Sequence, residues 1–91
     1  MNKERRRRLR VLLFWRQQGR CFYCDQPMTL SFAQRDNIWD NSATLEHLHR
    51  RADGGDGTKS NLVPACRRCN ERRGERDWQA YREQRSDSRE V

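Results

Sequence analysis

The chain has 91 residues, a formal net charge of +7, and a composition that is 33% hydrophobic and 36% charged. This length allows one small domain, whose limited core needs a metal, a disulfide or a partner to reinforce it, and no apolar run approaches the roughly 20 residues of a membrane span. The charge is mostly arginine, whose planar guanidinium pairs with phosphate, so contact with nucleic acid is favoured, although a merely soluble basic protein would share this composition.

The N-terminal segment is predicted to form a helix from Lys3 to Gln18, and Gly19 suits the position after its end. Residues of one face recur at three- and four-residue spacing: Leu9, Leu12, Leu13 and Arg16. The arginine run at 5–8 lies in the first turns, where cations oppose the helix dipole. This run is therefore either an arm that contacts DNA or a solvated tail.

Two short strands are expected in the middle of the chain, separated by a glycine-rich loop at 53–60. The first strand is Ala43 to Leu48. The second is Asn61 to Pro64, and its proline confines it to the edge or the end of a sheet. A further short strand is expected at Met28 to Ala33.

Helical sequence follows the second strand. One helix is predicted from Arg67 to Arg73, interrupted at Gly74, and another from Glu75 to Gln84, where Trp78 and Tyr81 are spaced to pack on the core. The polar stretch 85–91 is expected to be a disordered tail.

The cysteines form two Cys-x-x-Cys pairs, Cys21 with Cys24 and Cys66 with Cys69. Each pair can give two thiolates to one tetrahedral zinc, and four sulfurs leave no open position for water, so this zinc is expected to be structural. A redox pair and an iron site are the alternatives. No secretion signal is apparent, so we expect the protein in the cytoplasm, where thiols stay reduced and bind metals.

The spacing between the pairs indicates that the zinc clamps another module. The interval from Cys24 to Cys66 holds 41 residues, whereas an ordinary zinc ribbon holds roughly 15–20 there. This insert contains Glu46 and His47, and Asn70 follows the second pair. A carboxylate and an amide carbonyl suit Mg²⁺ or Mn²⁺, and a histidine can deprotonate water, so these residues fit metal-assisted cleavage of a phosphodiester.

This arrangement resembles the HNH endonuclease family, the ββα-metal nucleases. The order that carries the resemblance is Glu46-His47, Gly54-Gly55, Asn61-Leu62 and Cys66-x-x-Cys69-Asn70, and with the first cysteine pair it spans Cys21 to Gly74. The resemblance implies an α+β fold: a small ββα-metal core clamped by the four-cysteine zinc site, with flanking N- and C-terminal helices.

The resemblance also implies a role for each matching residue. Glu46 and Asn70 would hold a catalytic Mg²⁺ or Mn²⁺, and His47 would be the general base. Asn61 would tie the loop to the backbone and orient His47.

Three features depart from the family pattern or complicate it. Glu46 stands where the family most often has aspartate, so its metal would sit differently. His49 lies two residues from His47, on the same side of an extended strand, and is either a second base, a phosphate contact or a solvent-facing residue. Because side chains alternate along a strand, Glu46 and His47 would also point to opposite faces. Both can reach one phosphate only if a turn begins at these residues.

Arginines surround the helix that carries Asn70. Helical spacing places Arg68, Arg72 and Arg76 on one face, which could follow phosphates. The alternative is ion pairing with Glu71, Glu75 and Asp77. The residues expected to contact nucleic acid are Arg50, Arg51, Arg68, Arg72, Arg76 and His49.

The sequence therefore predicts an HNH endonuclease that hydrolyses DNA, most simply duplex DNA. The expected division is a basic helix or arm at 1–19, a nuclease core at 20–74, and a C-terminal helix with a polar tail at 75–91. A non-catalytic, zinc-stabilised module that binds nucleic acid is the rival. The sequence leaves open whether a larger protein or a second copy takes part.

Overall fold

A computed structural model of the chain describes residues 2–30, 39–50, 54–55 and 58–89. The element order is α1 (Lys3–Arg16), β1 (Ala43–His47), a short 3₁₀ turn η2 (Lys59–Asn61), β2 (Leu62–Cys66), α2 (Arg67–Arg73) and α3 (Trp78–Arg89). The expected fold class is confirmed, because helices surround a two-stranded antiparallel sheet and the four cysteines lie together beside it.

The sheet is a hairpin in which Ala43 faces Cys66 and His47 faces Leu62. Pro64 pairs with Leu45, and a proline fits here because each strand of a two-stranded sheet is an edge strand. The carbonyl of Pro64 accepts a hydrogen bond of 2.9 Å from Phe22 N, so the first cysteine pair is anchored to β2 through the main chain.

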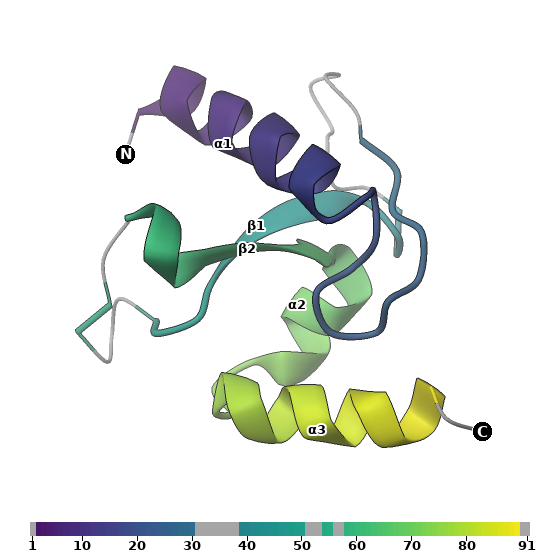
Figure 1. Cartoon of the computed structure of the whole chain (residues 1–91). Coiled ribbons are helices and arrows are strands. Elements are labelled where there is room, and N and C mark those ends of the chain that lie inside the picture. Colours follow the sequence, from purple (N-terminus) through teal and green to yellow (C-terminus); the bar gives the residue numbers. More distant parts are fainter. Residues whose placement is uncertain (1, 31–38, 51–53, 56–57, 90–91) are drawn as a thin grey trace.

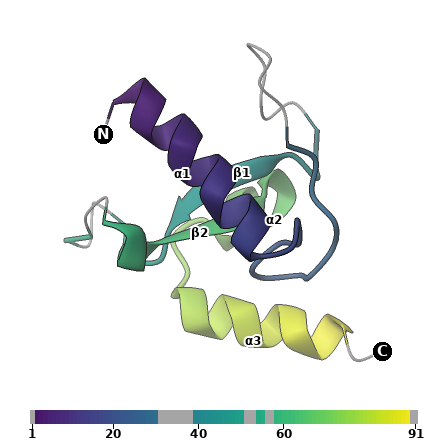
Figure 2. The ribbon, with the colours of Figure 1, turned by 45° about the horizontal axis from the view of Figure 1, so that its top comes forward.

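The helices cover both faces of the hairpin: α1 crosses one face and α2 packs against the other, while α3 lies beyond α2 (Figures 1 and 2). Leu9 and Leu13 of α1 form an apolar cluster with Leu62, and Leu45 packs against it. Because side chains alternate along β1, Thr44 and Glu46 face α2 instead. The layer between β1 and α2 is therefore polar, and the layer beneath α1 is apolar.

The helix ends follow local sequence. The side chain of Asn2 caps α1, and Gly19 adopts a φ of +72° just after that helix. Of the three leucines expected on one face of α1, Leu9 and Leu13 are buried, whereas Leu12 is 36% exposed, so the predicted stripe is wider than the real one.

The C-terminal helix differs from its predicted bounds at both ends. It begins at Trp78, because Asp77 precedes it as a cap and accepts a hydrogen bond of 3.2 Å from Ala80 N. It continues to Arg89, so the disordered tail predicted from residue 85 is wrong for 85–89. No glycine or proline occurs there to end a helix, and polar composition alone did not reveal this continuation.

Two glycines close the loop after β1. Gly54 has a φ of +87°, which residues with a side chain rarely adopt. Gly55 needs the absence of a side chain for a different reason, because a Cβ there would lie 1.7 Å from the carbonyl oxygen of His49. Its N–H donates a 2.8 Å hydrogen bond to Arg50 O, which draws the loop onto the residues that follow His47.

The strand expected at Met28 to Ala33 is reduced to isolated bridges in the described part, one between Thr29 and Ser42 and one between Pro27 and Arg20. Residues 31–33 lie outside the described residues. None of the described helices is both long and apolar enough to cross a bilayer.

Candidate active site and metal centre

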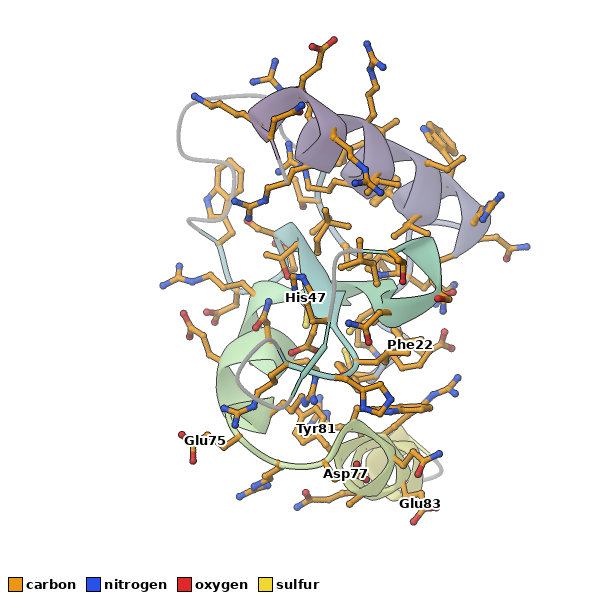
Figure 3. The ribbon with its side chains drawn as sticks, turned by 90° about the vertical axis from the view of Figure 1, so that its left-hand side faces the viewer. Phe22, His47, Glu75, Asp77, Tyr81 and Glu83 are labelled. Carbon is orange, nitrogen blue, oxygen red and sulfur yellow. The ribbon has the colours of Figure 1, made fainter. Side chains whose placement is uncertain are left out.

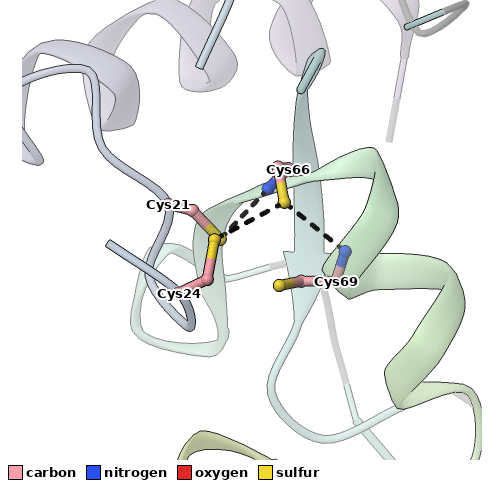
Figure 4. A group of neighbouring side chains, drawn as sticks. All are labelled: Cys21, Cys24, Cys66 and Cys69. Carbon is pink, nitrogen blue, oxygen red and sulfur yellow. Dashed lines mark hydrogen bonds between the residues drawn. The ribbon is translucent and has the colours of Figure 1, made fainter. Parts of the chain in front are cut away.

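The four cysteines converge, as predicted, on one buried point (Figure 4). Their sulfur atoms all lie within 4.8 Å of one another, and Cys24 Sγ lies 3.9 Å from Cys66 Sγ. A zinc–sulfur distance of about 2.3 Å in a tetrahedron separates the sulfurs by roughly 3.8 Å. The donor set and its spacing therefore fit a metal ion such as zinc.

Backbone N–H groups stabilise negative charge on these sulfurs. Tyr23 N donates to Cys21 Sγ at 3.4 Å, Cys66 N donates to the same sulfur at 3.3 Å, and Cys69 N donates to Cys66 Sγ at 3.4 Å. Hydrogen bonds among the thiols lower the pKa of Cys24, lower the pKa of Cys69 to about 6, and raise the pKa values of Cys21 and Cys66. Metal binding by these cysteines requires the loss of their thiol protons.

Glu46 of β1 and Asn70 of α2 belong to the two elements that enclose the polar layer, and each contacts a residue of the facing element. Asn70 Nδ2 donates a 3.1 Å hydrogen bond to Thr44 Oγ1, and the Thr44 hydroxyl donates to Ala65 O at 2.7 Å. This chain of bonds fixes the amide, so that its carbonyl oxygen is the atom left to act as a ligand. Glu46 is 6% exposed, and its Oε2 makes no hydrogen bond within the described part of the chain.

The turn after His47 is fastened by Asn61. The Asn61 side chain accepts from His49 N at 2.8 Å and donates to His49 O at 3.0 Å, and its main-chain carbonyl accepts from Leu48 N at 2.8 Å. His47 is the last residue of β1, half-buried at the start of this turn (Figure 3). The turn thus begins directly after His47, which itself still pairs with Leu62.

Arg73 is a residue of the site to which the sequence patterns gave no role. It is 3% exposed, and its guanidinium donates to His47 O and Leu48 O at 2.6 Å each and to Arg76 O at 2.9 Å. It also lies 3.5 Å from Glu46 Oε1. The clue in the sequence is its spacing of three residues from Asn70, which places both on the face of α2 that meets β1.

Burial is the dominant influence on the Glu46 carboxyl. It raises the pKa to about 7, while the hydrogen bond from Tyr23 and the charge of Arg73 act in the opposite direction. Burial, followed by the charge of Glu46, raises the pKa of Tyr23 as well. Glu46 is therefore a carboxyl that titrates near neutral pH and gains from a cation beside it.

The residues expected to contact nucleic acid have diverse surroundings. Arg68 lies 3.5 Å from Asp40, and Arg50 lies 3.7 Å from Glu75. His49 is exposed, and its main chain is the part that Asn61 holds. Arg51 lies outside the described residues.

The single helical face predicted for Arg68, Arg72 and Arg76 is wrong. Gly74, with a φ of +51°, ends α2 after Arg73, so Arg76 belongs to the connection to α3. Arg72 and Arg76 instead line one pocket together with residues of α3. Ion pairing, the alternative, holds for Arg67 with Glu71 at 2.9 Å.

Comparison with known proteins assigns the chain to a family. The model of the HNH endonuclease family matches residues 21–76, more than half of the chain. The chain therefore belongs to the HNH endonuclease family, and the resemblance seen in the sequence is confirmed.

One relative that the chain resembles is the CRISPR-associated endonuclease Cas9 of Corynebacterium diphtheriae, to which it is 36% identical over 59 residues. The matched stretch is 65% of this chain but only 5% of the length of that relative. The similarity thus concerns one small segment of a far larger protein.

Removing the Arg73 guanidinium should destabilise the fold strongly. We expect Arg73→Met to lower the free energy of unfolding by about 3 kcal/mol, because Glu46 and three carbonyl groups lose a buried partner. The control is Arg72→Met, an exposed neighbour on the same helix, which should change stability by roughly 0.5 kcal/mol or less. Urea unfolding measures both, and equal effects would contradict the role of Arg73.

Stability should fall as Glu46 ionises. Its pKa in the folded chain, about 7, lies above the ordinary 4.5, so the stabilising contribution is complete below the lower value and is lost as pH rises through the higher one. Without an added divalent cation, wild type should lose about 1 kcal/mol per pH unit relative to Glu46→Gln between about pH 5.5 and 7. Parallel stability curves for the two proteins would show that Glu46 is already ionised in this range.

Proposed function

We propose that the chain is a divalent-metal-dependent endonuclease that hydrolyses phosphodiester bonds in DNA. The observation that carries this proposal is the pairing of Glu46 Oε2, buried and without a hydrogen bond among the described residues, with an Asn70 amide oriented by Thr44. The Glu46 carboxylate and the Asn70 amide offer two oxygen donors from facing elements, and Glu46 Oε2 has no cationic partner among the described residues. Oxygen donors of this kind suit Mg²⁺ or Mn²⁺.

A bound cation would polarise the scissile phosphate and stabilise the charge that develops on the leaving oxygen. Glu46 and Asn70 would hold it in place. Arg73 lies 3.5 Å from Oε1 of Glu46, whereas Oε2 makes no hydrogen bond among the described residues, so Oε2 is the proposed ligand atom. The chain thus provides one charged and one neutral oxygen ligand and leaves further positions to water and substrate.

His47 is the proposed general base, which takes a proton from the attacking water. Its position depends on the turn that follows it, and Asn61 and Arg73 hold the main chain of that turn from two sides. Asn61 is therefore a positioning residue in this proposal. His49 is exposed on the same turn and serves as a phosphate contact rather than the base.

The zinc proposed at Cys21, Cys24, Cys66 and Cys69 has a purely structural role. Four sulfur ligands complete a tetrahedron, so no position is left for water or substrate. Its contribution is to fold the chain, as the small apolar core requires. Thiols used in this way need a reducing compartment, which agrees with a cytoplasmic protein.

DNA is the proposed substrate on two grounds. The net charge of +7 attracts a polyanion, and the relative found is named a CRISPR-associated endonuclease. The proposed form of the substrate is duplex DNA.

Cleavage should depend on His47 and on an added cation. Zinc-loaded wild type should nick plasmid DNA with Mg²⁺ or Mn²⁺, and His47→Ala should lower the rate by at least about 100-fold, because a general base contributes on that scale. His49→Ala is the matched control and should cost much less. Glu46→Gln and Asn70→Ala should also lose cleavage while they keep zinc and bind DNA at low salt.

A different result would separate the enzyme from its rival. If the folded, zinc-loaded chain binds DNA but cuts no duplex, branched or single-stranded substrate with any of these cations, the chain is a binding module. If His49→Ala is the more damaging change, the base has been assigned to the wrong histidine.

Zinc should be present at one atom per chain. A mild chelator should leave this zinc bound and should stop cleavage, because it removes only the exchangeable Mg²⁺ or Mn²⁺. Cys66→Ser should unfold the domain, because Cys66 also caps α2. Elemental analysis and circular dichroism measure these outcomes, and a metal-free wild-type chain that stays folded would refute the structural role of zinc.

A further inference from the structure

A pocket of about 220 Å³ lies between the end of α2 and the adjoining face of α3. Its lining is Arg72, Arg76, Tyr81, Gln84 and Arg85. Three of these residues are arginines, and the lining includes no carboxylate. Figure 3 shows Tyr81 beside the start of α3, below His47.

The arginines of the pocket are not neutralised by the nearby acids. Within the described part of the chain, no ion pair joins a carboxylate to Arg72, Arg76 or Arg85. The acids of this region act elsewhere: Glu71 pairs with Arg67, Glu75 lies near Arg50, and Asp77 caps α3. Like charges gathered around one cavity repel one another, so an anion placed there is stabilised.

The pocket also has fixed polar walls. Arg76 Nη1 donates a 3.2 Å hydrogen bond to Gln84 Oε1, which holds the guanidinium at α3. Tyr81 is 3% exposed, and its hydroxyl oxygen makes no hydrogen bond with a described residue. This unpartnered hydroxyl offers a polar group inside the pocket lining.

Arg85 is the least exposed of the three arginines, and Arg72 and Arg76 are exposed. These two guanidinium groups are therefore the ones that an incoming anion would meet first.

We propose that this pocket binds a non-scissile phosphate of the nucleic-acid strand. The proposal rests on the proposed nuclease function and specifies where the strand is anchored. Arg73 connects the pocket to the active site, because it bonds Arg76 O at 2.9 Å and His47 O at 2.6 Å. A phosphate held by Arg72 and Arg76 therefore sets the register of the strand relative to His47.

The first test measures how binding of a labelled DNA duplex depends on salt, using the zinc-loaded chain without an added divalent cation. Each lost phosphate contact reduces the slope of log K against log salt by about 0.9. We expect Arg72→Gln combined with Arg76→Gln to reduce the slope by about 1 to 2. Arg85 is left intact, because it is partly buried and its loss would also change the packing of α3.

The matched control removes the same charge outside the pocket. Arg16→Gln combined with Arg82→Gln changes an exposed residue at the end of α1 and one that lies over the ring of Phe22, 4.1 Å from its centroid. This control should change the slope by less than the pocket pair. Equal slopes for the two double variants, with both folded by circular dichroism, would overturn the proposal.

A second test separates a strand phosphate from a free one. Inorganic phosphate should shift the Nε–Hε NMR signals of Arg72 and Arg76 in wild type. If these signals shift but the DNA slope is unchanged in the pocket variant, the pocket binds free phosphate and the strand assignment is overturned. Because no cleavage is needed, a reduced slope in a chain that never cuts DNA would uphold the pocket and refute the nuclease.

Discussion

The structure depends on the cluster of four cysteine thiols, and Cys66 is the member that connects this cluster to the sheet and to α2. This residue is the last of β2, the cap of α2 and a member of the cysteine cluster at once. Its sulfur accepts from Cys69 N, and its N–H donates to Cys21 Sγ. Strand, helix and the distant first cysteine pair are therefore fixed at one residue, so a chain with little apolar surface can hold α2 at a defined angle to the hairpin.

That geometry explains why the two faces of the hairpin differ. The face beneath α1 is closed by leucines, as in an ordinary small core. The face beneath α2 holds Thr44, Glu46, Asn70 and Arg73, and a polar layer of this kind is costly to bury. The cost is offset by a nearly complete set of hydrogen bonds, and Glu46 Oε2 is the conspicuous exception. In the proposed function, that exception is the cation ligand.

The arginines show how burial divides residues of one type into separate roles. Arg73 supports the turn after His47 from inside, while its neighbour Arg72 is exposed beside the pocket of α3. The two positions differ by one residue along α2, which is about 100° around the helix. The net charge of +7 therefore indicates that the chain attracts a polyanion, but it does not distinguish buried, structural arginines from exposed ones.

The sequence by itself determined the cysteine cluster, the hairpin, α2 and the family, because Cys-x-x-Cys spacing, strand alternation and the order of Glu46, His47, Asn61 and Asn70 are local patterns. It also anticipated that a turn must begin at His47. The break at Gly74 was also predicted from the sequence, and the structure shows that it takes Arg76 off the helical face of Arg68. Only the tertiary structure decided that Arg73 clamps the turn after His47 and that Gly55 packs on His49. These two features depend on contacts that form when the chain folds, and composition and periodicity do not specify such contacts.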